Sequence, residues 1–403
     1  MTEVSADQRQ LKQDSLTIGL VSLAHLMSHF FQLCWAPLFP RLHDAFAVNY
    51  LELGSVATAF YLTSGISQAF AGILVDRYGA RPMLLIGITS MAASIGLSGL
   101  VSDFWMLYPL AILAGAGNSV FHPADFSVLS LHVSKQRLGR AYGVHSFSGT
   151  LGWALAPVLI GGLAAVAGWR VALVVAGLAG LLVVALLVRF NAVLADAASR
   201  DSQESKRAAI PYARLIASPA IMMAFGYFLL TAAAGTGFQT FSTSVFVELY
   251  GILPQTATSA LTAYLIGSAI GILMGGQLAD HTNSHSRVAI AGLLGCAFLI
   301  LLVASGLLSF VLTTTVVFFA GLAQGITSPS RDILVKMATP PGATGKVFGF
   351  VYSGLDAGST VAPLMFGAFL DRHAIHAIFV GIALLYALST ISVLTVGRSR
   401  ANS

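Results

Sequence analysis

The segment GILVDRYGAR at residues 72–81 decides the fold of this chain. It separates two long apolar runs with a compact set of small and charged residues, namely Gly72, Asp76, Arg77, Gly79 and Arg81. A degenerate copy, GQLAD from Gly276 to Asp280, stands 204 residues further along and also follows a long apolar run. Two matching polar loops between apolar runs indicate a chain that is built from a duplicated helical unit.

The duplication extends along much of the two halves. Small residues and prolines between residues 114 and 161 recur at an offset of 206 residues. The matching positions are Ala114-Gly115, Pro123, Gly139-Arg140, Gly143, Gly152, Ala156-Pro157 and Gly161, against Ala320-Gly321, Pro329, Gly345-Lys346, Gly349, Gly358, Ala362-Pro363 and Gly367. Chance does not produce so many matches at one offset. Two parallel halves are the design of transporters that rock around a central site.

Composition excludes a water-soluble protein. Of the 403 residues, 56% are hydrophobic and 9% are Asp, Glu, Lys or Arg, and the mean hydropathy is +0.82. A soluble domain carries about 25% charged residues, so this chain lacks the charge to cover water-facing domains. The net charge of +5 is not clustered on one element, which argues against nucleic-acid binding. Cys34 and Cys296 lie in apolar runs and give no disulfide framework.

Twelve apolar runs are long enough to cross a bilayer, which requires about 20 helical residues. They cover residues 16–38, 51–75, 82–101, 104–128, 141–166, 168–190, 219–243, 256–279, 286–306, 308–333, 345–370 and 374–396. The predicted fold class is an all-α membrane protein with twelve transmembrane helices in two pseudo-symmetric six-helix bundles. The predicted domains are an N-terminal bundle (1–190), a polar cytoplasmic linker (191–215) and a C-terminal bundle (216–403).

Basic residues set the orientation in the membrane, because Lys and Arg gather in cytoplasmic loops. With the N-terminus in the cytoplasm, 18 of the 21 Lys and Arg residues fall on the cytoplasmic side. Only Arg41, Arg170 and Arg372 fall on the other side. Both termini are therefore predicted to be cytoplasmic.

The loop at 72–81, with its copy and the twelve predicted spans, resembles the signature of the major facilitator superfamily. Three stretches resemble fosmidomycin-resistance-type members: HFFQLCWAPLFPRL (29–42), GNSVFHPADFSVLS (117–130) and GRAYGVHSFSGTLGWALAPVLIGG (139–162). The resemblance implies that spans one, four, seven and ten line a central cavity. It also implies that the loop stabilises the outward-open state, with Asp76 facing the start of span eleven. Span four lacks the arginine of many drug antiporters in the superfamily, so proton coupling through that arginine is not available.

Polar residues inside the spans need an explanation, because a charge at the centre of a span costs roughly 2.5–3.5 kcal/mol. Spacings of four and three residues place one polar trio on a single face of span one and another on a single face of span four. These trios are His25, His29 and Gln32, and Asn118, His122 and Asp125. Pro123 lies within the second trio, where it bends or loosens the helix.

Proton coupling is predicted to run through His122 and Asp125, which are three residues apart on one helix face. Imidazole titrates near neutrality and suits a proton relay. Asp356, midway along span eleven, is the runner-up, and His29 and His145 are further candidates. The alternative for each histidine is a packed side chain that bonds a backbone carbonyl, and for Asp356 a neutral, hydrogen-bonded carboxyl group.

The candidate solute contacts are the polar residues of spans one, four, seven and ten, although amides and hydroxyls also bond helices together. They are His25, His29, Gln32, Asn118, His122, Gln239, Gln324 and Thr327.

The predicted function is secondary active transport by alternating access, with proton-coupled export of a small organic compound or drug. Import of a small metabolite, or of copper through His25 and His29, is the alternative. The sequence contains no H-E-x-x-H, G-x-S-x-G or P-loop pattern, so we expect neither an enzyme nor an ATP-driven pump. We expect no cofactor, no bound metal and no nucleic acid. The expected partners are a small-molecule solute, protons and the lipid bilayer, for a multi-pass monomer in the bacterial inner membrane.

Overall fold

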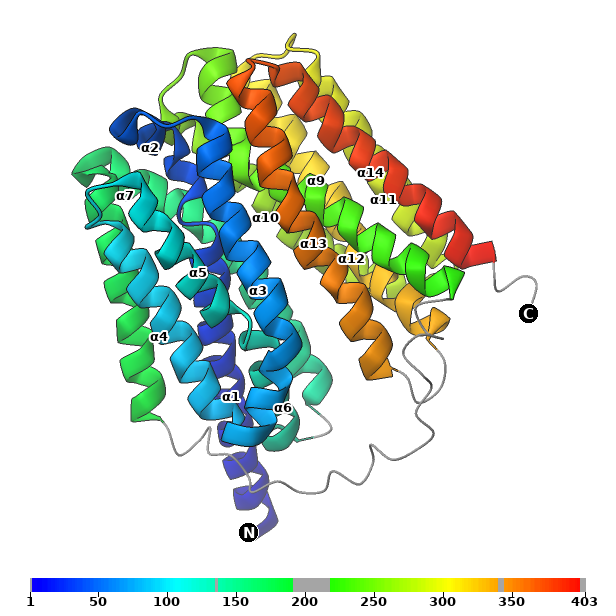
Figure 1. The fold of residues 1–403 in the computed structure, drawn as a ribbon. Coiled ribbons are helices and arrows are strands. Elements are labelled where there is room, and N and C mark those ends of the chain that lie inside the picture. Colours follow the sequence, from blue (N-terminus) through cyan, green and yellow to red (C-terminus); the bar gives the residue numbers. More distant parts are fainter. Residues whose placement is uncertain (1, 135–136, 191–217, 340–343, 399–403) are drawn as a thin grey trace. The chain divides into compact units, whose positions relative to one another are not determined.

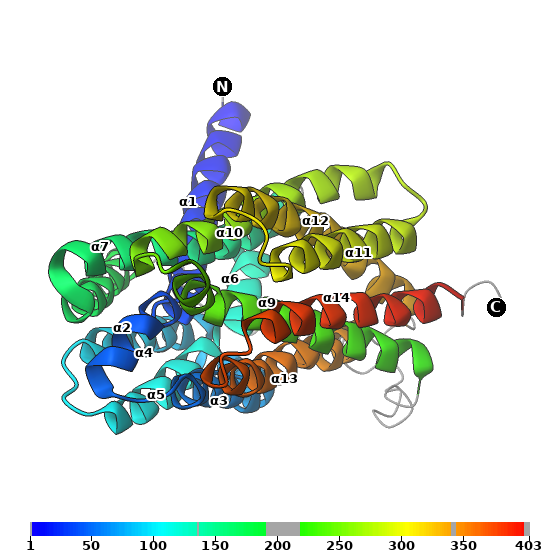
Figure 2. The ribbon, with the colours of Figure 1, turned by 90° about the horizontal axis from the view of Figure 1, so that it is seen from above.

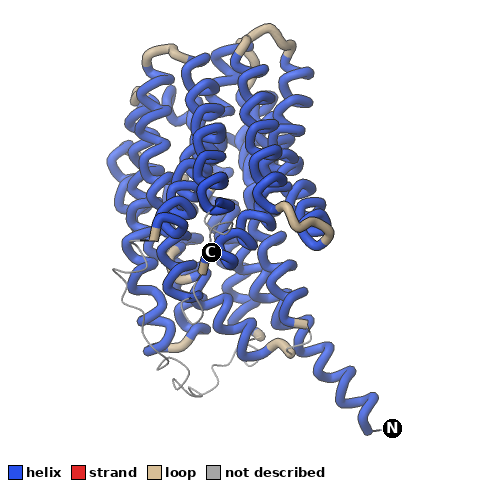
Figure 3. Tube along the Cα trace, turned by 90° about the vertical axis from the view of Figure 1, so that its right-hand side faces the viewer, coloured by secondary structure: helices blue, strands red, loops and turns tan. Residues whose placement is uncertain are grey.

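Helices joined by short loops make up the described part of the chain (Figure 3). The computed structural model describes residues 2–134, 137–190, 218–339 and 344–398. In chain order the helices are α1 (Thr2–Gln32), η1 (Ala36–Leu38), α2 (Phe39–Phe46), α3 (Tyr50–Tyr78), α4 (Ala80–Ser98), η2 (Phe104–Met106), α5 (Leu107–Asn118), α6 (Phe121–His132), α7 (Leu138–Arg189), α9 (Pro219–Tyr250), α10 (Pro254–Asp280), α11 (His285–Ala304), α12 (Phe310–Ala338), α13 (Thr344–Asp371) and α14 (Ile375–Arg398) (Figure 1).

Every predicted span is helical over most of its length. Nine helical stretches in the described residues are long and apolar enough to cross a membrane, judged by length and composition. One of them, within α7, contains both the fifth and the sixth predicted spans. The second and eleventh predicted spans coincide with α3 and α13, which are not among the nine. The predicted all-helical membrane fold is confirmed, while the count of twelve and the cytoplasmic termini stay predictions.

Glycines with a positive φ mark two of the predicted span boundaries. Gly168 has φ 83° and ψ 158° inside α7, so it interrupts the helix where the fifth predicted span ends and the sixth begins. Gly79 has φ 91° and ψ 152° and precedes the first residue of α4. Side chains with a Cβ rarely adopt such a φ, so glycine provides both turns at little steric cost.

Two compact units divide the chain. The first contains residues 1–38 and 62–202, and the second contains residues 39–61 and 203–403. The predicted linker, residues 191–215, lies wholly within residues 191–217, which are outside the described residues, so the predicted domain boundaries stay untested.

Residues 39–61 belong to the second unit because the first turns of α3 are bonded to α13. The two carboxylate oxygens of Asp371 accept the backbone N–H groups of Tyr50 at 2.7 Å and Leu51 at 2.8 Å. The Thr58 hydroxyl donates to the carbonyl oxygen of Thr360 at 2.8 Å. The first four N–H groups of a helix lack intrahelical partners, and Asp371 satisfies two of them here.

The internal repeat appears in the structure as matched hydrogen bonds. In the first unit, the Asn118 amide on α5 donates to the Ser64 hydroxyl on α3 at 2.9 Å. In the second unit, the Ser268 hydroxyl on α10 donates to the Gln324 side-chain oxygen on α12 at 3.0 Å. These serines are 204 residues apart and these amides 206, which are the two offsets of the sequence repeat. α10 and α12 lie side by side along their lengths (Figure 2).

The fourth predicted span is broken, whereas its repeat partner is not. α5 ends at Asn118 and α6 begins at Phe121, just before Pro123. Proline lacks the N–H that would bond the carbonyl four residues earlier, which loosens this part of the helix. Pro329, the matching proline, lies inside the continuous helix α12. The proline therefore weakens the helix in both repeats without being sufficient to break it.

Candidate functional site

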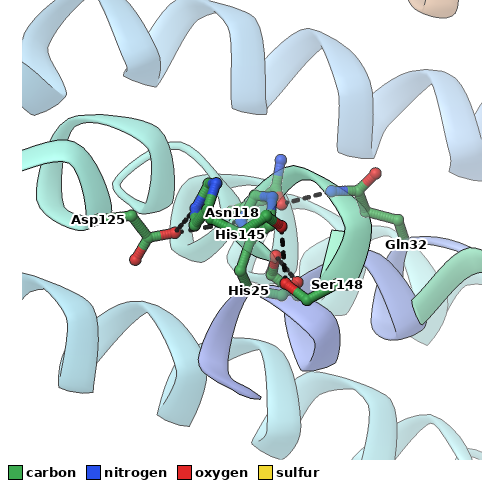
Figure 4. A network of polar contacts seen from close by, with 7 residues as sticks. His25, Gln32, Asn118, Asp125, His145 and Ser148 are labelled. Carbon is green, nitrogen blue, oxygen red and sulfur yellow. Dashed lines mark hydrogen bonds and ion pairs between the residues drawn. The ribbon is translucent and has the colours of Figure 1, made fainter. Parts of the chain in front are cut away.

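A buried carboxylate in the first unit is the centre of the site. Asp125, on α6, has no exposed surface. The Nε2 atom of His145 on α7 lies 2.9 Å from its Oδ2, within hydrogen-bond geometry. The Nδ1 atom of His25 on α1 lies 3.1 Å from the same oxygen. Figure 4 shows this carboxylate pointing toward the two imidazole rings. Three helices thus contribute one acid and two titratable bases to a single contact.

Further imidazoles surround this contact. The ring of His25 stacks on that of His145, with 3.7 Å between centroids and 23° between planes. The ring centroid of His29 lies 4.4 Å from that of His25, and the centroid of His122 lies 5.4 Å from it. His25, His29 and His145 are buried, whereas His122 is exposed. We call these four residues with Asp125 the histidine cluster.

Two glycines on α7 allow the cluster to form. A Cβ at Gly149 would lie 2.9 Å from Nε2 of His25, and a Cβ at Gly152 would meet the backbone oxygen of Leu26 on α1. Since both positions lack a side chain, α7 approaches α1 closely enough for His145 to stack on His25. Gly152, one of the small residues of the sequence repeat, therefore has a packing reason at this position, as small residues generally do at helix contacts in membranes.

The partners of Asp125 differ from the predicted pairing with His122. The contacts to its carboxylate come from α1 and α7, and His122 lies exposed in the first turn of α6. The break between α5 and α6 places His122 at the start of a helix, whereas Asp125 is one turn further in and faces the neighbouring helices. The role of each residue in coupling stays a prediction.

A row of polar side chains adjoins the cluster. The Gln32 amide on α1 donates to the side-chain oxygen of Asn118 at 2.9 Å, and Asn118 in turn donates to Ser64. The indole N–H of Trp153 on α7 donates to the Gln32 side-chain oxygen at 3.1 Å. We call Gln32, Asn118 and Ser64 the amide row. Sequence reasoning missed Trp153, although it lies eight residues after His145, on the same face of α7.

The remaining solute candidates lie in the second unit. Gln324 and Thr327 are neighbours on α12, where the Thr327 hydroxyl donates to the backbone oxygen of Gln324 at 2.7 Å. Gln239 is half-buried on α9. Asp356 is half-buried on α13, so it is less enclosed than Asp125.

The residues of the signature loop lie at the expected helix ends. Gly72 and Arg77 lie in the last two turns of α3, and Gly79 separates α3 from α4. Arg77 is exposed, with its guanidinium 5.3 Å from the Tyr78 ring centroid. Arg81 is half-buried in the first turn of α4. In the second unit, Gly276 and the exposed Asp280 lie in the last turns of α10. The side chain of Asp76 lies outside the described residues, so its predicted contact is untested.

The spacing of the cluster also raises the question of a metal ion. Ligand atoms of His25, Asp125 and His145 all lie within 4.8 Å of one another. An imidazole binds a metal along its in-plane lone pair, at about 2.0–2.1 Å for zinc. His145 is aligned on Oδ2 of Asp125, whereas Nδ1 of His25 approaches this oxygen without hydrogen-bond alignment. The spacing admits a metal, but the alignment of His145 on the carboxylate suits a proton shared between the two groups better.

Taken together, long apolar helices, two units with repeated packing, and a titratable cluster inside one unit define a membrane transporter built from a duplicated helical bundle. The chain belongs to the major facilitator superfamily, whose family model matches residues 21–253 and 228–403. It is an integral membrane protein and not an enzyme, and the predicted family is confirmed.

Relatives of known name support a transport role. The fosmidomycin resistance protein of Escherichia coli (strain K12) is 25% identical over 387 residues, covering 93% of this chain and 91% of that protein. The multi-drug resistance efflux pump PmrA of Streptococcus pneumoniae (strain ATCC BAA-334 / TIGR4) is 26% identical, covering 85% of this chain and 87% of that protein.

Among solved structures, a bacterial homologue of the human lysosomal transporter Spinster, inward-facing and occupied, has a TM-score of 0.72 at 13% identity. The match covers 95% of both chains and shows the shared fold.

Proposed function

We propose that this protein exports a small organic compound across the bacterial inner membrane in exchange for protons. Export is supported by the relatives that are named for fosmidomycin resistance and multi-drug efflux. Proton coupling is supported by one observation above all, namely a carboxylate with no exposed surface that is in contact with two histidines. A buried acid among titratable bases is a typical arrangement for holding a proton in a membrane protein.

The proposed coupling site works through the cost of burying charge. An ionised Asp125 without a partner would be expensive in this interior, so the carboxylate is stable either protonated or paired with an imidazolium. His145 provides the pair at 2.9 Å, and His25 provides a second base at 3.1 Å. His122 is exposed and close to His25, so it is the proposed entry and exit point for the proton.

Neutral polar side chains are the proposed solute contacts. Gln32 and Asn118 in the first unit, and Gln239, Gln324 and Thr327 in the second, offer both donors and acceptors without a fixed charge. Such contacts suit a polar or anionic compound better than a strong cation.

Transport in proteoliposomes tests the proposal. Purified full-length protein is reconstituted, a pH gradient is imposed, and fosmidomycin and ethidium are followed as an anionic and a cationic probe. Fosmidomycin is expected to accumulate on the more acidic side, against its own gradient, and a protonophore is expected to abolish this accumulation. Accumulation on the alkaline side would show import by co-transport with protons. Accumulation to the same level with and without the pH gradient would refute proton coupling.

A transition-metal importer is the second candidate, because three ligand atoms of the cluster lie within 4.8 Å of one another. Liposomes that contain a metal-sensitive dye distinguish the two functions. Copper or zinc entry at a rate that depends on the protein would favour the importer. We expect no such entry, since the 2.9 Å hydrogen bond between Nε2 of His145 and Asp125 suits a shared proton better than a metal ion.

A further inference from the structure

Trp153 is in contact with both polar systems of the first unit. Its indole N–H donates to the side-chain oxygen of Gln32 at 3.1 Å, which joins it to the amide row. Its ring centroid lies 4.3 Å from that of His29, with 52° between the planes, which joins it to the histidine cluster. The N–H group is the only polar group of the indole and binds Gln32, whereas the ring contacts His29.

His29 is the cluster residue that Trp153 touches, and it has unused bonding capacity. Its Nδ1 atom is buried and has no hydrogen-bond partner among the described residues. The titratable groups that face it are His25 on the same helix, His122 on α6 and His145 on α7. A proton that moves among these groups therefore changes the charge next to the indole face.

We propose that Trp153 is a positioning residue that couples protonation of the histidine cluster to solute binding at the amide row. The inference rests on the proposed proton-coupled function. A protonated imidazole is attracted to the face of an indole, and a neutral imidazole much less so. A solute that takes the side-chain oxygen of Gln32 displaces the indole N–H and changes how the ring lies on His29. Binding of a proton to the histidine cluster and binding of a solute to Gln32 thus each change the indole position that the other requires, which is a reciprocal coupling.

Fluorescence tests the contact with His29 without any solute or gradient. The emission of Trp153 is obtained as the difference between wild-type protein and Trp153→Phe, measured in detergent from pH 9 to pH 5. Imidazolium quenches indole emission, so the difference signal is expected to fall on acidification and to stay constant in His29→Gln or His29→Asn. A difference signal that does not change with pH overturns the inference, as does a fall that persists in both His29 variants.

Transport separates the two contacts of Trp153. Trp153→Phe keeps an aromatic ring on His29 and removes the N–H donor, whereas Trp153→Leu removes both. We expect Trp153→Phe to lower gradient-driven accumulation of fosmidomycin two- to tenfold, the effect of one lost hydrogen bond, with downhill exchange retained. Trp153→Leu should in addition shift the midpoint of the pH profile to lower pH. Trp105→Phe, at a tryptophan that is 68% exposed and remote from the cluster in sequence, is the control and should behave as wild type.

The fluorescence and transport experiments distinguish failure of the proposed function from failure of the role proposed for Trp153. If export itself is absent, the fluorescence measurement still decides whether His29 titrates against Trp153. If export is normal in wild type and Trp153→Phe accumulates fosmidomycin with the same ratio and pH profile, the positioning role of Trp153 is wrong while the proposed function stands.

Discussion

Replacement of Asp125 by asparagine should uncouple transport from the proton gradient without unfolding the protein. The Asp125→Asn side chain has the same size, remains neutral at every pH, and its amide N–H can donate to Nε2 of His145 in place of the shared proton. One carboxylate binds one proton, and one pH unit corresponds to 1.36 kcal/mol, or a factor of about ten in concentration. For one proton per solute and no membrane potential, a gradient of about two pH units supports roughly 100-fold accumulation in wild type. The variant should reach a ratio of about one.

The assay compares two modes of transport in the same proteoliposomes. Gradient-driven accumulation of fosmidomycin should disappear in Asp125→Asn and in His122→Ala, while counterflow without a pH gradient should continue. Asp14→Asn is the matched control, because Asp14 is equally buried in the first unit but is bonded to Ser134 at 2.6 Å and Arg137 at 3.0 Å, away from the cluster. If Asp125→Asn and His122→Ala concentrate fosmidomycin normally and Asp356→Asn does not, the coupling site is on α13 and our assignment is wrong.

Other substitutions test the remaining features. Asp76→Asn should slow transport and leave fosmidomycin affinity in a conformationally locked protein nearly unchanged, and a large loss of affinity would contradict a purely conformational role. Gln203→Cys should react with a membrane-impermeant maleimide only from the cytoplasmic side, over a low background because both native cysteines are buried; labelling from outside would overturn the topology. Gly168→Ala should lower stability by about 1–3 kcal/mol in a thermal unfolding assay, because glycine alone readily adopts φ 83° with ψ 158°, whereas Gly162→Ala, with open space around its Cβ, should not.

Local rules predicted a large part of the molecule. Apolar length located the helices, and the small-residue pattern located the duplication. The boundary between the fifth and sixth predicted spans, at residues 166–168, falls at the break at Gly168. The shared face of His25 and His29 followed from their spacing alone, and their rings lie 4.4 Å apart. These features depend on one helix at a time, so the sequence is sufficient to predict them.

Contacts between helices were not predictable in the same way. The bond between His145 and Asp125 joins side chains from different helices and depends on the close approach of α7 to α1 at Gly149. Likewise, the capping of α3 by Asp371 joins positions about 320 residues apart. Spacing along one helix favoured His122 as the partner of Asp125, because it considers only residues of that helix. It contains no information about which neighbouring helix packs against Asp125.

The matched hydrogen bonds at Ser64 and Ser268 have an evolutionary consequence. They align the two repeats residue by residue, and this alignment puts Arg331 at the position of Asp125. Arg331 bonds to the adjacent Asp332 at 2.9 Å and lies 4.5 Å from the Phe228 ring centroid. The duplication is thus kept in the backbone, while this position carries an acid in the first copy and a base in the second. Under the proposed coupling, only the first repeat carries a proton-binding carboxylate at this position, so the two halves contribute unequally to the stoichiometry of the pump.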